Sequence, residues 1–194
     1  DGRIQCHENV PRQTNRTGKL RLLLLTHNLN LEGAPLFLLE YATYMARDAE
    51  FALEILTSLD GPLRTAFEAL GAHITVVDSA LLYASPDEET FHQRLSDLSH
   101  QLEWERIDLV VCNTLVSFWG VLMARRAGKP SLFYIHESTT VFRFFEVKLE
   151  LKLHHLVHEA LGRSTHTLFL CAATRAYYED SNLHGNFRIV PSWI

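Results

Sequence analysis

Polar side chains that suit the binding of a sugar or an anion follow the apolar run at residues 20–26. His27 and Asn28 come directly after this run, and the letters EGAP at residues 32–35 begin a helical pattern. Backbone N–H groups at a helix start are unpaired and carry partial positive charge, so anions bind there. Gly33 lets a ligand approach its own backbone and that of Ala34. We therefore predict an oxyanion or sugar site here, with an ordinary tight turn as the alternative; Glu32 would compete with a phosphate and suits a hydroxyl group.

A second polar turn follows the apolar run at residues 109–113. Asn113 ends the run and Thr114 follows it, so both side chains are candidates to hydrogen-bond a ligand hydroxyl group. The alternative is that this turn only places Ser117, which would cap the next helix. Motifs of other site classes are absent from the sequence: it has no GxGxxG, no GxSxG and no GxxxxGK[ST].

A third polar turn ends the run at residues 131–136. His136 is followed by Glu137 and Ser138, and an imidazole near neutral pH can donate to or accept from a sugar hydroxyl group. His154 and His158 have the i, i+4 spacing of a metal pair. Because no third ligand accompanies them, we predict no metal and a solvated helix face instead.

Alternating strand and helix patterns must position these turns. The strand-like runs are residues 20–26, 51–57, 73–77, 109–113, 131–136, 167–171 and 187–190. The helix-like segments between them are residues 34–47, 63–70, 88–106, 117–127, 141–161 and 175–181. Runs such as LLLL and LVVC are apolar throughout, which is typical of strands buried on both faces. We predict an α/β fold: a doubly wound, mostly parallel, seven-stranded Rossmann-like sheet with helices on both faces, which binds ligands at the carboxyl ends of its strands.

Composition limits the partners. The 194 residues carry a net charge of −5 with a pI near 6.1, which argues against a nucleic-acid binder. Residues 1–18 read as a polar tail or linker, and residues 19–194 as one domain. Cys112 and Cys171 lie in apolar runs and predict buried thiols in a reducing, cytoplasmic compartment. The chain lacks an initial Met and ends just after an apolar run, so we expect a piece of a longer protein.

The sequence resembles the N-terminal, acceptor-side domain of the GT-B glycosyltransferases, specifically glycosyltransferase family 4, from about residue 20 onward. Four segments carry the resemblance in order: LLLLTHNLNLEGAPLFLLEYA, DGPLRTAFEALGAHITVV, IDLVVCNTLVSFWGVLMARRAGKPSLFYIHES and FRIVPSWI. The first resembles the family's glycine turn, the third the pair of strands that ends in a His-Asp or His-Glu, and the last the strand before the hinge. Each segment is modest alone, but their order and spacing are specific.

The resemblance implies roles for the turn residues. His136 would contact the transferred sugar, Gly33 and Ala34 would approach the donor diphosphate, and Glu137 and Ser138 would border the acceptor. Acceptor or sugar contacts would come from the remaining candidates, which are His27, Asn28, Glu32, Asn113 and Thr114. The family also implies a nucleotide-sugar donor, no metal, and retention of anomeric configuration without an enzyme nucleophile.

Three features depart from the family pattern. Glu32 stands where the family often has Gly or Ser. Ser192 and Trp193 replace the usual Asn-Gly after Pro191. The second domain, which in this family grips the nucleotide, is missing from the sequence.

The sequence thus predicts the acceptor-side domain of a glycosyltransferase that moves a sugar to a glycan, lipid or small-molecule acceptor, inactive in isolation. One alternative is a Rossmann-like binding module without chemistry, and another is an epimerase of nucleotide sugars. The mixed charges and apolar residues of the segment 141–161 also allow peripheral contact with the cytoplasmic face of a membrane.

Overall fold

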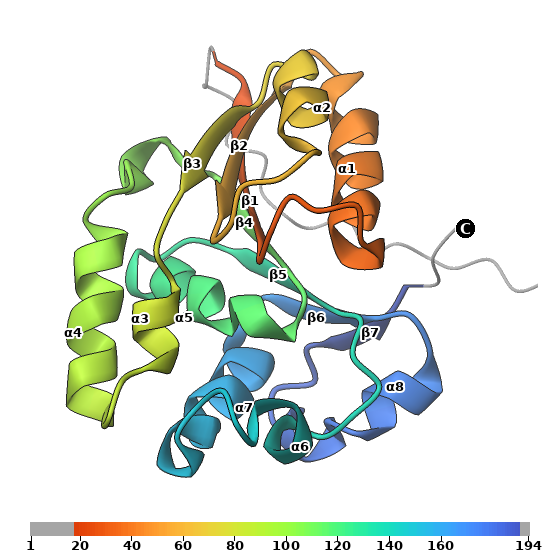
Figure 1. The fold of residues 1–194 in the computed structure, drawn as a ribbon. Coiled ribbons are helices and arrows are strands. Elements are labelled where there is room, and N and C mark those ends of the chain that lie inside the picture. The colour runs from red at the N-terminus through yellow and green to blue at the C-terminus, as the bar shows by residue number, and fades with distance from the viewer. Residues whose placement is uncertain (1–17, 191–194) are drawn as a thin grey trace, which may run out of the picture.

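Seven strands form the centre of the chain in a computed structural model that describes residues 18–190 (Figure 1). The strands are β1 (Leu20–Thr26), β2 (Phe51–Thr57), β3 (His73–Val76), β4 (Leu109–Asn113), β5 (Ser131–Ile135), β6 (His166–Phe169) and β7 (Phe187–Ile189). Their order across the sheet is β3-β2-β1-β4-β5-β6-β7. Every pairing in this part of the chain is parallel. The predicted fold class is therefore confirmed, with a sheet that is fully rather than mostly parallel.

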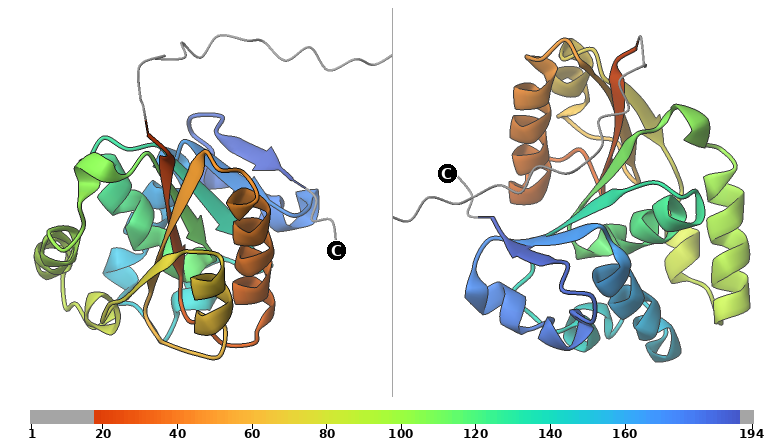
Figure 2. Two further views of the ribbon diagram at one scale, coloured as in Figure 1. Left: turned by 90° about the horizontal axis from the view of Figure 1, so that it is seen from above. Right: turned by 180° about the vertical axis from the view of Figure 1, so that it is seen from behind.

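Helices cover both faces of this sheet (Figure 2). The α-helices are α1 (Gly33–Ala46), α2 (Arg64–Ala69), α3 (Ala80–Tyr83), α4 (Glu88–Ser99), α5 (Phe118–Arg126), α6 (Val141–Phe145), α7 (His154–Arg163) and α8 (Ala172–Ala176). The short 3-10 helices are η1 (Trp104–Arg106), η2 (Leu115–Ser117), η3 (Leu151–Leu153) and η4 (Glu179–Ser181).

Alternate residues of β1 divide the core into two layers. Leu22 and Leu24 pack with α1 and α2 on one face. Leu23 and Leu25 pack with α4, α5 and α7 on the other. All four leucines are at most 2% exposed, which explains why the LLLL run lacks polar alternation.

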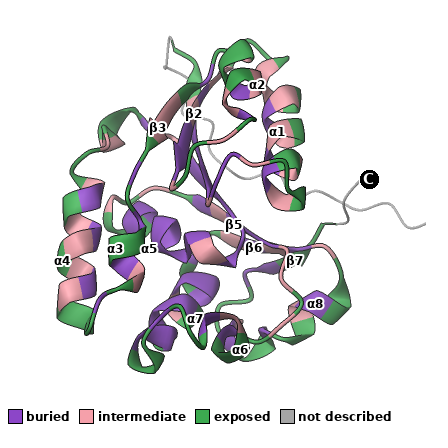
Figure 3. Ribbon diagram, in the orientation of Figure 1, coloured by how far each residue is buried: buried purple, intermediate pink, exposed green. Residues whose placement is uncertain are grey.

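Helix α5 is buried along most of its length and is largely purple in Figure 3. Every residue from Phe118 to Ala124 is buried. Gly120 allows this helix to sit directly on the sheet, because a Cβ atom there would lie 2.2 Å from Leu25 Cδ2 and 2.7 Å from Cys112 Sγ. Since α5 follows β4, this close packing holds the β4–α5 turn in place.

The predicted long helix at residues 141–161 is wrong as a single element. The chain forms α6, breaks, and resumes as η3 and α7. Apolar residues alternate through the break, so that Leu149 and Leu153 are buried while Val147 is 92% and Leu151 is 65% exposed. Glu150 has φ −53° and ψ 132°, outside the helical region, so it interrupts the helical path between α6 and η3. The apolar stripe that has helical spacing in this segment is nevertheless buried; its members are Phe145, Leu149, Leu153, Leu156 and Ala160.

Other boundaries also differ from the predictions. The segment 88–106 splits into α4 and η1, and the Trp104 indole donates to the carbonyl of Ser99 at the end of α4 (3.0 Å). Helix α3 is an additional short helix, and the predicted helix at 175–181 is replaced by α8 and η4. Cys112 is buried as predicted, but Cys171 is exposed, because β6 ends at Phe169 and Cys171 lies in the turn before α8. The predicted tail and the Pro191-Ser192-Trp193 hinge lie outside the described residues, apart from Gly18.

Candidate functional site

The three predicted polar turns meet at the carboxyl edge of the sheet, beyond β1, β4 and β5. The chain leaves β1 for α1 on one face and leaves β4 for α5 on the opposite face. Neighbouring parallel strands whose connections diverge in this way create a crevice, and open α/β sheets bind ligands in it.

A chain of hydrogen bonds links the three turns. The Nδ2 group of Asn113 donates to the carbonyl oxygen of Ala34 in the first turn of α1 (2.8 Å). Because that bond directs the Asn113 amide nitrogen toward α1, its Oδ1 atom faces His136 and accepts from the ring Nε2–H, 2.8 Å away. Asn113 therefore fixes both the orientation and the tautomer of His136, and leaves Nδ1 of the ring with a lone pair.

Aromatic rings surround His136. Phe37 of α1 packs edge-on against the imidazole with ring centroids 5.0 Å apart, and Tyr134 stacks on it at 5.5 Å. Burial, together with the nearby His27, lowers the pKa of His136 from 6.5 to about 4. At neutral pH the ring is therefore uncharged: it accepts a hydrogen bond at Nδ1, but it is not a cation.

Glu137 points into the protein. Both of its carboxylate oxygens accept from the backbone N–H of Leu115 (3.0 Å each), and one also accepts from the backbone N–H of His136 (3.1 Å). Its backbone carbonyl accepts from the hydroxyl group of Tyr178 (3.0 Å). Burial raises the pKa of the Glu137 carboxyl, although the backbone N–H groups oppose that shift. The structure thus places this carboxylate as a brace between β5 and η2.

The β4 turn is strained at Thr114. This buried residue has φ 83° and ψ 154°, in the region that favours glycine, at a typical cost of about 1–3 kcal/mol. Its Oγ1 atom is buried and has no hydrogen-bond partner among residues 18–190. Ser117 makes no side-chain cap for α5, contrary to the capping alternative, and its hydroxyl group donates back to the carbonyls of Asn113 and Thr114 (3.0 and 2.7 Å).

The β1–α1 turn gathers its polar side chains around the carboxylate of Glu32. His27 Nε2 lies 3.4 Å from Oε2, Asn28 Nδ2 donates to Oε2 at 3.2 Å, and Asn30 Nδ2 donates to Oε1 at 3.4 Å. Hydrogen bonds from Asn28, His27 and Asn30 lower the pKa of Glu32, so its carboxylate is ionised at neutral pH. The Glu32 side chain is 52% exposed and makes no cap bond to α1.

Gly33 is the first residue of α1. A Cβ atom at this position would meet nothing within 4 Å, and the backbone is not in the left-handed region. The fold itself therefore does not need glycine here. Because Glu32 supplies no cap, the first-turn N–H groups of Gly33 and Ala34 have no side-chain partner in the described part of the chain.

The remaining predicted residue, Ser138, is exposed and lies beside α8, where its hydroxyl group is 3.0 Å from Thr174 Oγ1. Sequence reasoning missed Phe37, which packs on His136. The signal was present, since Phe37 lies four residues after Gly33 and so on the same side of α1. Tyr178 was also missed, because its contact with Glu137 joins residues 41 positions apart.

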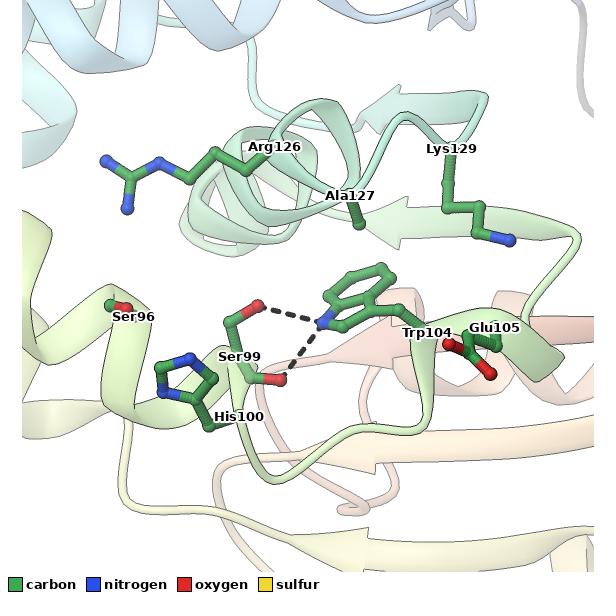
Figure 4. Close-up of a pocket in the computed structure, with 8 residues that line it drawn as sticks. All are labelled: Ser96, Ser99, His100, Trp104, Glu105, Arg126, Ala127 and Lys129. Carbon is green, nitrogen blue, oxygen red and sulfur yellow. Dashed lines mark hydrogen bonds between the residues drawn. The ribbon is translucent and has the colours of Figure 1, made fainter.

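A separate hollow of about 430 Å³ lies at the opposite edge of the sheet, beside the turns that precede β4 and β5. Figure 4 shows its lining side chains, with the Trp104 indole bonded to Ser99 and with Arg126 and Lys129 extending away from the ring in opposite directions. None of the predicted site residues lies there, so we assign the candidate site to the carboxyl edge.

The described residues, 18–190, hold neither a metal-binding cluster nor a membrane-spanning helix. Among residues 18–190, no group of three or more His, Cys, Asp or Glu side chains is arranged to hold a metal ion. His154 is buried, and its Nε2 lies 3.1 Å from the carbonyl of Leu149, whereas His158 Nδ1 lies 2.7 Å from the Ser181 hydroxyl group. No helix in this part of the chain has the length and apolarity needed to cross a membrane. Peripheral membrane contact stays a prediction.

Known proteins resemble this chain in their family and in their fold. The family model of Glycosyltransferase Family 4 matches residues 32–194. No curated protein sequence matches the chain. Among solved structures, HepE of Anabaena in complex with UDP and glucose is similar, with a TM-score of 0.61 and 13% identity over 90% of this chain and 45% of HepE.

Two further structures show how widely the fold is shared. A lipopolysaccharide outer core galactosyltransferase, WaaB, has a TM-score of 0.59 and 7% identity, covering 90% of this chain and 46% of its own. A UDP-GlcNAc 2-epimerase from Neisseria meningitidis, bound to UDP-GlcNAc, has a TM-score of 0.55 and 10% identity over 88% of this chain and 45% of its own. The chain spans less than half the length of these proteins, and at such identities the likeness shows the fold alone.

Proposed function

This chain belongs to glycosyltransferase family 4, and from that premise we propose that it is the acceptor-side domain of an enzyme that transfers a sugar from a nucleotide-sugar donor to an acceptor hydroxyl group. The observation that carries the proposal is the hydrogen-bonded chain from His136 through Asn113 to Ala34, next to the open backbone at Gly33. This chain of bonds joins an imidazole that suits a sugar hydroxyl group to a helix start that suits an anion, at the edge of the sheet where folds of this kind bind ligands.

In the proposed complex, His136 contacts the transferred sugar. Its Nε2–H is committed to Asn113, so the ring accepts a hydrogen bond from a sugar hydroxyl group through Nδ1. Phe37 and Tyr134 hold the ring in place without competing for that bond. A neutral, preoriented acceptor of this kind loses little free energy to reorganisation when the sugar binds.

The backbone N–H groups of Gly33 and Ala34 would approach the donor diphosphate. The open space at Gly33 supports this role. The ionised Glu32 opposes it, since a carboxylate beside a helix start repels a second anion. We therefore propose that the diphosphate is gripped mainly by a second domain, and that Glu32, held by His27 and Asn28, receives a hydroxyl group of the sugar or the acceptor.

We propose transfer with retention and without an enzyme nucleophile. Glu137 is the carboxylate nearest in sequence to His136, but both of its oxygens bind backbone N–H groups inside the protein. It is thus unsuited to attack a sugar carbon. Stabilisation of the leaving diphosphate would then supply much of the rate enhancement. The cytoplasmic location and the absence of a metal cofactor remain parts of the same proposal.

Calorimetric titration of this chain with UDP-sugars tests whether the donor is bound mainly by a second domain. We expect weak binding, because half of the proposed cleft supplies only two backbone N–H groups to the diphosphate. We also expect no sugar transfer by the 194-residue chain alone. Sub-micromolar binding of a nucleotide sugar to this chain would contradict the proposal, and it would favour a self-contained binding module.

A further inference from the structure

A cavity of about 290 Å³ adjoins the candidate site at the ends of β1 and β2. Its wall includes His27 and Leu59 on the sheet side, Ala80 and Tyr83 of α3, Val116 of η2 and Trp119 of α5. His27 also contacts Glu32, so this residue forms the partition between the cavity and the β1–α1 turn. The volume is near the lower end of the range for small-molecule sites, about 300–1,000 Å³.

The polar groups in this wall are already bonded to one another. The hydroxyl oxygens of Ser58 and Ser79 lie 2.5 Å apart. Tyr83 donates to the backbone carbonyl of Val116, and Ser117 donates to the carbonyls of Asn113 and Thr114. Thr26 donates to the carbonyl of Asn28 (3.3 Å). Although several wall residues are serines or threonines, each of these hydroxyl groups already takes part in a hydrogen bond within the protein.

The surface that remains to contact a ligand is mostly apolar. Leu59, Val116 and Ala80 contribute aliphatic side chains to the lining, and Tyr83 and Trp119 contribute aromatic ones. A saccharide buried here would leave several of its hydroxyl groups unpaired, at about 1–3 kcal/mol each. An aryl or alkyl group has no hydrogen bonds to lose, and its transfer from water into the cavity is favourable.

Polar groups remain at the edge of the cavity. Asp78 is exposed and accepts from the Ala80 N–H (3.1 Å), which leaves its carboxylate capacity for another donor. His27 stands on the side toward Glu32. A hydroxyl group attached to an apolar ring would therefore find a polar partner at His27, on the side of the candidate site, or at Asp78, which follows β3.

A neighbouring hollow extends the cavity past α3. It has a volume of about 660 Å³ and shares Ala80 and Tyr83 with the first cavity. Its border is mixed, because the charged residues Glu146, Lys148 and Glu150 alternate there with the exposed Val147 and Leu151. The far end of a longer acceptor would thus leave over a surface that is both polar and apolar rather than be enclosed.

We propose that the 290 Å³ cavity binds the apolar part of a hydroxyl-bearing acceptor, an aryl or alkyl group, with the hydroxyl group held at the edge beside His27. The enzyme would accordingly glycosylate an aryl or alkyl alcohol in preference to another saccharide. This inference rests on the proposed function, because only a glycosyltransferase would use the bound molecule as an acceptor. The preference of the cavity for an apolar group does not depend on a donor.

The test is calorimetric titration of the chain, without donor, by 2-naphthol and by methyl β-D-glucopyranoside. We expect saturable one-site binding of 2-naphthol with a negative heat-capacity change, which marks apolar burial, and no binding of the glucoside. Ala80→Trp should fill the cavity from its exposed rim and weaken naphthol binding at least roughly tenfold. Ala84→Trp is the matched control, because Ala84 is also exposed and lines only the neighbouring hollow.

A second variant guards against misfolding of the first. Val116→Thr keeps the side-chain shape, adds one hydroxyl group to the wall, and should weaken naphthol binding roughly three- to tenfold. Binding of the glucoside but not of 2-naphthol, or equal naphthol binding by Ala80→Trp, Val116→Thr and the unmodified chain, would overturn the inference. Either result would leave the proposed glycosyltransferase function standing, since that is tested with the donor.

Discussion

The β5 turn and the β1–α1 turn contribute to one site but are built in opposite ways. At the β5 turn, Glu137 is half-buried and bonded to two backbone N–H groups, and His136 is held by Asn113. At the β1–α1 turn, Glu32 is half exposed, its three side-chain bonds are 3.2–3.4 Å long, and Gly33 faces open space.

The difference shows that two glutamates in turns at the same edge of the sheet have different roles. A carboxylate that satisfies backbone donors contributes to stability, because its loss leaves those donors unpaired. An exposed carboxylate held by long bonds contributes little stability and keeps capacity for a ligand. The β5 turn is thus a preorganised support with one free acceptor at His136, and the β1–α1 turn is the part left open to a ligand.

The largest expected effect concerns His136. In the full-length enzyme, His136→Ala should lower turnover by roughly 10²–10⁴ if the imidazole contacts the reacting sugar. His184→Ala, in an exposed turn, is the control and should keep full turnover. Unchanged turnover in a well-folded His136→Ala protein would make His136 a structural residue and remove the main function that we assign to the β5 turn.

The same substitution at the two glutamates tests the comparison directly. Glu137→Ala should lower the free energy of unfolding by about 2–3 kcal/mol, because the N–H groups of Leu115 and His136 lose their acceptor. Glu32→Ala should change it by less than about 0.5 kcal/mol, as is usual for surface positions. Urea denaturation of both variants measures the difference, and equal losses would show that the two turns are not built differently.

Acid should weaken the β5 turn selectively. The folded pKa of His136, about 4, lies below its unfolded value near 6.5, so the native state favours the neutral ring. This preference for the neutral ring adds to the free energy of unfolding in full above pH 6.5, and the added stability is lost as the pH falls from 6.5 toward 4. We expect His136→Gln to lose about 1–2 kcal/mol less stability than the unmodified chain across that window.

The comparison with a variant is needed because burial also lowers the pKa of His158, which contributes with the same sign. Urea titrations at a series of pH values provide the measurement. Parallel pH curves for His136→Gln and the unmodified chain would mean that the ring is not held neutral by the fold.

The substitution Gly33→Ala should have a smaller effect, which concerns binding of the donor. Gly33→Ala should leave stability unchanged within about 0.5 kcal/mol, because its Cβ atom meets nothing in the protein. It should weaken donor binding by the full-length enzyme roughly three- to tenfold if a diphosphate approaches this backbone. Gly18→Ala also places its Cβ atom in open space, but away from the site, and serves as the control. Donor affinity equal in both variants would place the diphosphate elsewhere.

The smallest effect is expected from neutralising Glu32. Glu32→Gln should strengthen binding of UDP roughly two- to fivefold, because a carboxylate at a helix start disfavours a neighbouring anion. It should also weaken binding of the sugar or acceptor whose hydroxyl group we propose that Glu32 receives. Competition binding with UDP and with the free sugar separates the two contacts. Unchanged affinity for UDP, for the sugar and for the acceptor would remove Glu32 from the ligand contacts and contradict the view of this turn as the open one.

Much of the architecture was predictable. Uninterrupted apolar runs and polar turns predicted all seven strands of the described region, as well as α1, α2 and α5, since local periodicity and turn residues report these directly. The break between α6 and α7 was not predicted, because the stripe through Phe145, Leu149 and Leu153 fits a helix equally well. Only packing decides which of two compatible backbone paths buries those residues.

The sequence alone located the ends of β1, β4 and β5 to within one residue, and with them the set of polar residues that could reach a ligand, because parallel strands bring their carboxyl ends to one edge. Tertiary structure alone decided how each one is used. Asn113 orients His136 across 23 residues, Glu137 turns inward to Leu115 across 22, and the serines of the cavity wall bond to each other or to backbone. Hydrogen-bonding capacity depends on which partners the fold brings within about 3 Å, and that information is not contained in residue type or spacing.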